Sequence, residues 1–448
     1  NMGIILKRNG RVEEAIDSYK KAISLRSDYV QAYNNLGSLY KDRQEYEDAI
    51  EMFTKVKELQ PDNHKSYFNL ALVKREQGLN EEAMKLFLKV LDLNPEHSDA
   101  KCNISIIKNE NGLPEEAKKY LLEILKTDQK HENAPKYLAA IALKQERFEE
   151  VWRYYEYRWK ASPQNQVIWP FQHKPLWQGE RGKRVSLWRE QGIGDDIIFL
   201  SLVPEVKEMC KSLSVYVDRR LQDLCKRAMP EINFVKDLEE LENIECDYHL
   251  PLGSVPGLIR NDISDFDRTV KGYMTADPLR VETIRNELKL KDKMVIGISW
   301  KSNKSLNQEK KSIQLKDMER IFSGLDVVLI NLQYGDVDDE IREFKEATGI
   351  DVVQCASVDN REDLDGLAAL IELCDLVVST SNVTVHLAGA LAKETWVMLP
   401  HVLVNFWWLS DRPNSIWYPS LSLHRQTKPD NWENVYLSIR TELKNKLY

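Results

Sequence analysis

Small and apolar residues recur with a step of 34 positions along the first part of the chain. Three sets of positions keep this step: one is always alanine, one holds small residues, and one holds an aromatic residue or leucine. They are Ala15, Ala49, Ala83 and Ala117; Gly3, Gly37, Ala71 and Ser105; and Tyr19, Phe53, Phe87 and Leu121. Small residues at fixed points allow paired helices to approach closely, so the pattern predicts helix pairs stacked into an α-solenoid.

The motif within each period resembles the tetratricopeptide repeat, most clearly in YNNLGSLYKDRQEYEDAIEMFTKVKELQPD at residues 33–62. Gly10, Gly78 and Gly112 share one turn position, where Gln44 occupies the remaining slot. Four units extend to about residue 131 and a fifth, degenerate unit reaches about residue 159. We therefore expect a repeat domain at 1–160. The resemblance implies a concave face that binds a protein or peptide, although a fold alone does not identify a function.

Asparagine also recurs with the 34-residue step, at Asn1, Asn35, Asn69 and Asn103. These residues are expected on the inner helix of each unit, where they would form a ladder along the groove. An amide side chain offers a donor and an acceptor, so it can pair with a peptide backbone without reading side chains. The arrangement resembles the asparagine ladder of eukaryotic O-GlcNAc transferase. The alternative interpretation is that asparagine is simply common at this repeat position.

The helical periodicity stops after the repeats, and residues 161–184 have the composition of an ordered linker. Short β-like runs then alternate with helical runs, which predicts parallel sheets with crossover helices. The expected strands are VSLW, SVYV, INFV, DYHLPL, MVIGISW, DVVLINLQ, DVVQC, DLVVST and TWVMLP, and NWENVYLSIRTELKNKLY is expected to be a helix. A break near LRVETIRNELKLKDK divides this part into two Rossmann-like halves, at 185–290 and 291–448.

The composition restricts the class of protein. The chain has 448 residues, 42% hydrophobic and 30% charged, as in a globular protein of two or three domains. No apolar run approaches the roughly 18 residues needed to cross a membrane, and we expect a cytoplasmic protein with reduced, mostly buried cysteines. A net charge of −8 argues against a nucleic-acid-binding protein. The first residues already have a mid-helix pattern, so we expect the sequence to be a piece of a longer chain.

Two glycines and two acids stand where the first strand leads into a helix, in WREQGIGDDIIF. Gly192 and Gly194 are expected to permit a turn that side chains would not tolerate. The stretch lacks the third glycine of a dinucleotide fingerprint and the G-K-[ST] of a P-loop. An acid in the first helical turn repels a bound phosphate, so Asp195 and Asp196 favour a carboxylate site beside a polar substrate. The alternative is that one Asp only caps the helix.

Three further stretches follow expected strands of the second half, where ligands bind in open α/β sheets. Trp300, Lys301 and Ser302 precede a lysine-rich loop, and Gln333 and Tyr334 could meet a nucleobase or ribose. Hydroxyl and ammonium groups suit a diphosphate, and the helix start near Thr384 offers backbone amides to an anion. The same stretch contains Ser381, Asn382 and His386. The alternatives are a solvated loop, favoured for Lys310 and Lys311, and a structural role for His386. Trp407 and Trp408 could line a sugar site or pack between domains.

The ordered set of motifs resembles the bacterial tetratricopeptide-repeat glycosyltransferases, whose catalytic part resembles the heptosyltransferase family and its GT-B fold. The set comprises LWQGERGKRVSLWREQGIGDDIIF, DYHLPLGSVPGL, VIGISWKSN, NLQYGD, DLVVSTSNVTVHLAGALAKETWVMLP and WYPSLSLHRQ, and covers nearly the whole chain. In that family a Gly-Asp pair supplies a carboxylate near the acceptor, which implies that Asp195 is the general base. The nucleotide-binding residues carried over from the family are Trp300, Lys301 and the helix start from Ser381 through Ala388. The family's usual acid and threonine are replaced by Ser381 and Asn382, which puts the donor in doubt.

The resemblance implies a metal-independent enzyme without a cofactor. It would transfer a sugar from a nucleotide sugar to a Ser or Thr hydroxyl of a protein held in the repeat groove, with flagellin as the expected acceptor class. Asp195 would accept the hydroxyl proton, while Lys301, Ser302 and the helix start at Thr384 would stabilise the leaving diphosphate. The alternatives are a non-catalytic repeat scaffold with a degenerate nucleotide-binding domain, and a transferase acting on a glycan or lipid-linked acceptor.

Overall fold

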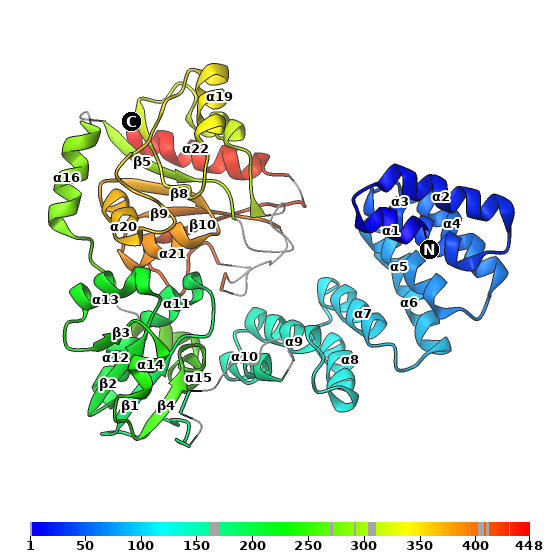
Figure 1. Ribbon diagram of the computed structural model, residues 1–448, viewed down its shortest axis with the longest axis horizontal. Helices are drawn as coiled ribbons and strands as arrows, with labels where there is room; N and C mark the ends of the chain where they lie inside the picture. Colours follow the sequence, from blue (N-terminus) through cyan, green and yellow to red (C-terminus); the bar gives the residue numbers. More distant parts are fainter. Residues whose placement is uncertain are drawn as a thin grey trace. The chain divides into compact units, whose positions relative to one another are not determined.

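The chain forms two compact units in the computed structural model (Figure 1). The repeat unit contains Asn1–Ala142 and Tyr154–Asn165, and the α/β unit contains Leu143–Arg153 and Gln166–Tyr448. The structure describes residues 2–160, 170–171, 173–268, 272–290, 293–302, 311–401, 407–408, 412–429 and 431–448.

The repeat unit is built from antiparallel helix pairs, as the 34-residue period predicts. From α1 to α8 each helix contacts the next one along the chain. The helices are α1 (Met2–Arg8), α2 (Val12–Leu25), α3 (Val30–Asp42), α4 (Tyr46–Leu59), α5 (His64–Glu76), α6 (Asn80–Leu93), α7 (Ser98–Glu110), α8 (Pro114–Thr127), α9 (Asn133–Lys144) and α10 (Phe148–Tyr155).

The small residues of the period lie where two helices of a pair meet. A Cβ atom added to Gly3 would lie 2.6 Å from the Tyr19 ring, and one added to Gly37 would lie 2.8 Å from the Phe53 ring. Side chains cannot occupy such distances, so glycine is required for these helix pairs to approach. The alanines that recur with the same step are completely buried.

The turn between the paired helices uses left-handed backbone in every unit. The φ angles are +75° at Gly10, +62° at Gln44, +77° at Gly78 and +76° at Gly112, and the register continues to Glu146 at +54°. Left-handed backbone closes a helix and favours glycine. Gln44 and Glu146 therefore adopt the same turn against their intrinsic preference.

The first sheet of the α/β unit has four parallel strands in the order β3-β2-β1-β4. The strands are β1 (Arg184–Trp188), β2 (Ser212–Tyr216), β3 (Asn233–Val235) and β4 (Tyr248–Pro251). The neighbouring helices are α11 (Ile193–Leu200), α12 (Val203–Met209), α13 (Gln222–Ala228), α14 (Leu238–Glu242) and α15 (Pro256–Ile259). The next helix, α16 (Pro278–Leu288), contacts α20 (Leu364–Glu372) of the second half (Figure 1).

The second sheet has six parallel strands in the order β10-β9-β8-β5-β6-β7. The strands are β5 (Met294–Ser299), β6 (Val327–Asn331), β7 (Val352–Val353), β8 (Leu376–Thr380), β9 (Thr395–Leu399) and β10 (Leu421–Arg425). The helices are α18 (Glu319–Phe322), α19 (Asp338–Thr348), α20 (Leu364–Glu372), α21 (Val383–Ala390) and α22 (Glu433–Leu447). All nine expected strands form, and the expected fold class, helical repeats followed by a parallel-sheet α/β region, is confirmed. Strand β10 was not predicted.

Both sheets are doubly wound, since strands are added outward on one side of the first strand and then on the other. The order therefore reverses between β1 and β4 and between β5 and β8, and ligands bind at such switch points beyond the carboxyl ends of the strands. Helix α11 follows β1 and helix α21 follows β8, and these two helices pack against each other. The two halves thus meet at their expected ligand-binding edges.

Two segments outside the sheets belong to the α/β unit. Within the expected linker, residues 161–169 and 172 lie outside the described residues, but Trp177 is buried and its backbone N–H donates to the His249 carbonyl at 2.9 Å, at the edge strand β4. The second helix of the degenerate repeat contributes Trp152, whose indole N–H donates to the Arg260 carbonyl at 2.5 Å. Phe148 of that helix packs on Phe266, with ring centroids 4.9 Å apart.

Candidate functional site

A cavity of about 850 Å³ lies between the two halves of the α/β unit, and segments that follow parallel strands line it. Gly192, Gly194 and Asp195 contribute from the start of α11, and Ser381, Asn382 and His386 contribute from the start of α21. This volume is that of a typical small-molecule site.

The two glycines of the first loop do not provide the conformational freedom expected of them. Gly192 has a φ of −72° and is the N-cap residue of α11, and Gly194 is absent from the positive-φ residues. Gly194 instead allows close packing, since a Cβ atom there would lie 3.0 Å from His386 Cδ2. The expectation that these glycines permit a turn which other residues could not adopt was wrong. Helix α11 begins with backbone angles that any residue can adopt, and Gly194 instead packs against His386 of α21.

Asp195 and Asp196 have opposite environments although they are adjacent. Asp195 lines the cavity, and its Oδ1 accepts a hydrogen bond of 2.6 Å from the Trp407 indole N–H. Asp196 is 1% exposed, and its Oδ2 accepts a hydrogen bond of 2.6 Å from Arg189 Nε. Burial raises the pKa of Asp195, with the Trp407 hydrogen bond opposing the shift. Burial likewise raises the pKa of Asp196 to about 7, against the effect of Arg189.

Five of the nucleotide-binding residues expected from the sequence line the cavity: Ser302, Tyr334, Ser381, Asn382 and His386. Asn382 is the N-cap of α21, because its Oδ1 accepts from Thr384 N at 3.0 Å. Its Nδ2 donates to Ser299 Oγ at 2.7 Å, which fixes the end of β5. His386 stacks on Trp408 with ring centroids 5.4 Å apart, and burial lowers its pKa to about 3, so the imidazole is neutral.

The other four expected residues do not line this cavity. Trp300 and Thr384 are completely buried. Gln333 Oε1 accepts from Trp300 N at 2.9 Å and Lys301 N at 2.7 Å, so it occupies two backbone donors at the end of β5. Lys301 Nζ forms an ion pair with Glu340, which also accepts from the Trp300 indole at 2.8 Å. These side chains hold the strand end together instead of lining the cavity.

Several cations that line the cavity were missed by sequence reasoning. Lys311, expected on a solvated loop, lines the cavity, and burial lowers its pKa while Asp195 opposes that shift. Lys304 and Lys310 lie outside the described residues. The remaining lining cations are Arg189, Arg219, Arg220, Lys236 and Arg361. The signal that could have found four of them is position: Arg189 and Lys236 directly follow β1 and β3, and Arg219 and Arg220 come within four residues of the end of β2.

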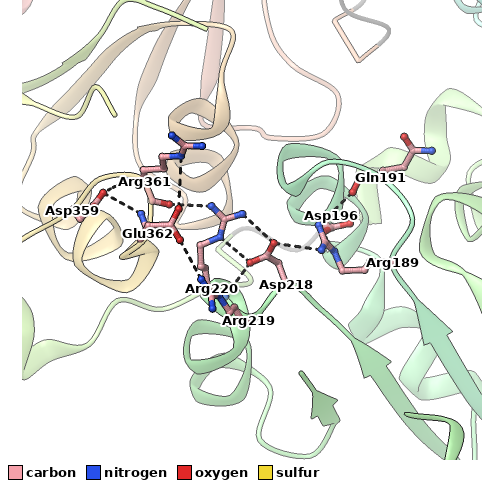
Figure 2. A network of polar contacts seen from close by, with 9 residues as sticks. All are labelled: Arg189, Gln191, Asp196, Asp218, Arg219, Arg220, Asp359, Arg361 and Glu362. Atoms are coloured by element: carbon pink, nitrogen blue, oxygen red, sulfur yellow. Dashed lines mark hydrogen bonds and ion pairs between the residues drawn. The ribbon is translucent and has the colours of Figure 1, made fainter. Parts of the chain in front are cut away.

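Some of these arginines belong to a network that connects the two halves, shown in Figure 2. Asp218 accepts from Arg220 Nε at 2.9 Å and lies 3.4 Å from Arg189 Nη1. Although burial opposes it, hydrogen bonding from Arg220 leaves the pKa of Asp218 below its ordinary value. Arg220 Nη1 then donates to the Arg361 carbonyl at 3.0 Å. The network thus runs from Asp196 at the first loop to the segment after β7.

The asparagine ladder of the repeat unit is only partly available. Asn35 and Asn69 are half-buried, and Asn69 Nδ2 donates to Asn34 Oδ1 at 3.5 Å. Asn103 is buried, donates to the Asp99 carbonyl at 2.7 Å and accepts from Arg75. Asn1 lies outside the described residues.

The described ranges contain no group of three His, Cys, Asp or Glu side chains that could hold a metal ion. Every helix in these ranges is too short or too polar to cross a membrane.

Comparisons with known proteins identify the repeats and one relative. Models of the tetratricopeptide repeat match residues 3–42, 30–63 and 64–97. Protein FlbA of Caulobacter vibrioides is 30% identical over 330 residues, which cover 68% of this chain and 54% of FlbA. The chain therefore spans about half the length of this relative.

Solved structures similar to this chain cover about a third of it. MamA is 19% identical, with a TM-score of 0.33, over 36% of this chain and 94% of MamA. PilF of Pseudomonas aeruginosa is 22% identical, with a TM-score of 0.33, over 37% of this chain and 75% of that chain. YrrB, described as a TPR protein with an unusual peptide-binding site, is 20% identical, with a TM-score of 0.30, over 36% and 84%. The N-terminal part of the chain, matched by the family models, consists of tetratricopeptide repeats.

Proposed function

We propose that the α/β unit is a glycosyltransferase of the GT-B type, which transfers a sugar from a nucleotide sugar to a hydroxyl group of an acceptor protein. The observation that carries the proposal is the position of the Asp195 side chain. Its carboxylate lines the cavity between two doubly wound halves, at the switch point of the first sheet, and is held by Trp407. A desolvated carboxylate there is suited to accept a proton from a hydroxyl nucleophile.

Asp196 does not share this role in the proposal. It is buried, does not line the cavity, and forms an ion pair with Arg189, so we assign its carboxylate to orienting the first loop. This assignment agrees with the motif resemblance, which also singles out Asp195 of the two.

The leaving diphosphate is assigned to the second half. Ser302, Ser381 and Lys311 line the cavity near the start of α21, where backbone amides favour an anion. Lys301 and Gln333 are assigned a structural role because neither lines the cavity. Lys301 forms an ion pair with Glu340, and Gln333 accepts a hydrogen bond from the Trp300 backbone N–H. No metal or cofactor takes part in this proposal.

The repeat unit is proposed to recruit the acceptor, since tetratricopeptide repeats are helix-pair solenoids with extended binding surfaces. Asn35 and Asn69 remain the candidates for pairing with a peptide backbone. Asn103 is the weakest candidate because its side-chain oxygen already accepts a hydrogen bond from Arg75. A flagellin-type protein with an exposed Ser or Thr is the proposed acceptor class, on the motif resemblance alone.

A direct test measures release of free nucleotide from a panel of nucleotide sugars, with acceptor protein present. We expect Asp195→Asn to reduce turnover by at least a hundredfold while donor binding, measured by thermal shift, is retained. Asp196→Asn, the matched neighbouring change, should retain more activity. Equal loss in both variants would contradict the assignment of the base to Asp195.

A second candidate function is a non-catalytic binding protein. The observation that favours it is the internal use of Lys301, Gln333 and Asn382, which leaves fewer polar groups for a nucleotide than the family's motif implies. A wild-type protein that binds a nucleotide sugar and its acceptor but releases no nucleotide would support this function instead.

A further inference from the structure

Cations stand one or a few residues beyond each of the three adjacent strands β1, β2 and β3. The strand register pairs Trp188 with Tyr216 and Tyr216 with Val235. The first residues beyond β1 and β3 are therefore Arg189 and Lys236, while Arg219 follows Tyr216 by three positions. Parallel register thus gathers side chains distant in sequence on one edge of the sheet, where all of them line the cavity.

The second half adds a cation to this group. Arg220 Nη1 donates to the Arg361 carbonyl at 3.0 Å, which brings the segment after β7 to the same place (Figure 2). Together Arg189, Arg219, Arg220, Lys236 and Arg361 make a basic cluster on the cavity wall.

The carboxylates of this region do not neutralise the basic cluster. Asp196 and Asp218 contact Arg189 and Arg220. Glu362 lies 3.5 Å from Arg219 and 3.7 Å from Arg361, both of which are exposed side chains. Among the described residues that line the whole cavity, six are cations, since Lys311 is added, and three are carboxylates, namely Asp195, Asp218 and Glu362. This excess of positive charge occurs in a chain whose net charge is −8. Like charges gathered in a cleft raise the local concentration of an oppositely charged ligand.

We propose that the exposed part of the basic cluster, Arg219, Lys236 and Arg361, binds an anionic group of the sugar substrate, either a phosphate or a carboxylate. Arg189 and Arg220 are held by Asp196 and Asp218, so they form a fixed base for this site. Arginine suits the planar, bidentate recognition that phosphate and carboxylate require.

This inference rests on the proposed function for the identity of the ligand as a sugar substrate, and it differs from that proposal in location. The diphosphate of the donor is assigned to the start of α21 with Lys311. The basic cluster lies on the opposite half, after β1, β2 and β3. It therefore accounts for an anionic group of the substrate other than the donor's diphosphate.

The test is calorimetric titration of the full chain with inorganic pyrophosphate, with glucuronate, and with glucose as the uncharged match of glucuronate. The test variant is Arg219→Gln with Lys236→Gln, two exposed residues whose replacement should leave the fold intact. The control is Arg342→Gln with Lys345→Gln, which removes the same charge from exposed ion pairs of α19. A Lys311→Gln variant probes the start of α21.

We expect the test variant to raise the Kd of pyrophosphate or glucuronate at least tenfold, with the control unchanged and glucose not bound. Loss of pyrophosphate affinity identifies a phosphate, and loss of glucuronate affinity identifies a carboxylate. The proposal is overturned if neither anion binds, if the control loses affinity equally, or if only Lys311→Gln weakens binding. Asp195→Asn removes a negative charge from the same cavity and should not weaken anion binding, so failure of the catalytic proposal remains distinguishable.

Discussion

At the scale of the residue, two adjacent aspartates acquire different chemistry from their positions on one helical turn. Successive residues of a helix point about 100° apart, so when Asp195 faces the cavity, Asp196 faces the protein interior. Trp407 contacts the first and Arg189 contacts the second. Identical side chains therefore differ in access to substrate, and the difference is decided by the helix and not by the residue type.

The pH dependence of turnover should report the carboxyl group of Asp195. Burial raises its pKa above the ordinary value of 3.8. A general base acts only when deprotonated, so turnover should fall as the pH falls through this raised pKa, and the acidic limb should lie above that of an exposed Asp. The measurement is kcat/KM from pH 4 to 8 in a constant-ionic-strength buffer.

Two variants identify the source of that acidic limb. His386 has a pKa of about 3 and is neutral over this range, so His386→Gln should leave the position of the limb unchanged. Asp196, with a pKa of about 7, is the other candidate. If Asp196→Asn abolishes the limb, then Asp196 and not Asp195 is the titrating group.

The sequence indicates residue roles only where a side chain acts alone. Asp195 was recognisable beside Gly194, but the internal contacts of Lys301 with Glu340 and of Gln333 with two backbone amides depend on residues distant in sequence. Arg219 and Lys236 could have been recognised, because each follows an expected strand. No motif marks them, since their proximity arises from strand register.

At the scale of the element, the contact of α11 with α21 depends on the absence of a side chain at Gly194. In Gly194→Ala the new Cβ would lie 3.0 Å from His386 Cδ2, and His386 is confined by its stacking on Trp408. We expect a loss of about 1–3 kcal/mol in the free energy of unfolding, as for an overpacked interior, and at least tenfold lower turnover because Asp195 is the next residue.

Gly192→Ala provides the matched control for this change. A Cβ atom at Gly192 meets only Asp195 Oδ2, at 3.6 Å. Urea denaturation should therefore show a smaller loss for Gly192→Ala than for Gly194→Ala. The opposite order would mean that the loop, and not helix packing, requires glycine.

The repeat turns provide a stability prediction of opposite sign. Gln44 has left-handed backbone with a φ of +62°, which costs a non-glycine residue about 1 kcal/mol. Gln44→Gly should therefore stabilise the repeat unit by up to about 1 kcal/mol, measured by thermal denaturation followed by circular dichroism. Gln31→Gly, within the helix α3, should destabilise it instead. If Gln44→Gly destabilises the repeat unit, then the left-handed backbone at Gln44 is not strained.

Strand β10 was missed because the sequence pattern detects runs of apolar residues. The nine expected strands are apolar runs, because most of them are buried on both faces of a parallel sheet. Strand β10 lies at the edge of its sheet, and in its LSLHR sequence the half-exposed Ser422 and Arg425 stand among the buried Leu421, Leu423 and His424. Its short polar sequence therefore carries little of the signal used for the others.

At the scale of the whole molecule, specific polar contacts join the two halves of the α/β unit. Arg227 of α13 forms a bidentate pair with Asp365 of α20, at 2.9 and 3.0 Å. The Met274 N–H donates to the Ala390 carbonyl of α21 at 3.1 Å, and the hydroxyl of the preceding Tyr273 donates to the Ile197 carbonyl at 2.5 Å, two residues after Asp195. The association of the halves and the geometry of the first loop are therefore coupled.

Loss of the Arg227 pair should loosen this association. In Asp365→Asn one charged partner is removed from a partly buried pair, which costs about 1 kcal/mol. Amide hydrogen exchange in α13 and α20 should accelerate by about fivefold. Asp339→Asn removes the exposed partner of Arg342 and should change exchange little. Unchanged exchange in Asp365→Asn would show that apolar packing alone joins the halves.

The hydrogen bond from Trp407 to Asp195 provides a fluorescent reporter in the cavity. Every tryptophan except Trp159 belongs to the α/β unit, and the Trp407 indole is bonded to the carboxylate that a hydroxyl substrate would approach. A ligand that displaces this hydrogen bond should alter the ultraviolet emission of Trp407, and subtracting the spectrum of Trp407→Phe isolates that contribution. Candidate substrates can thus be ranked by fluorescence titration before any product has been identified.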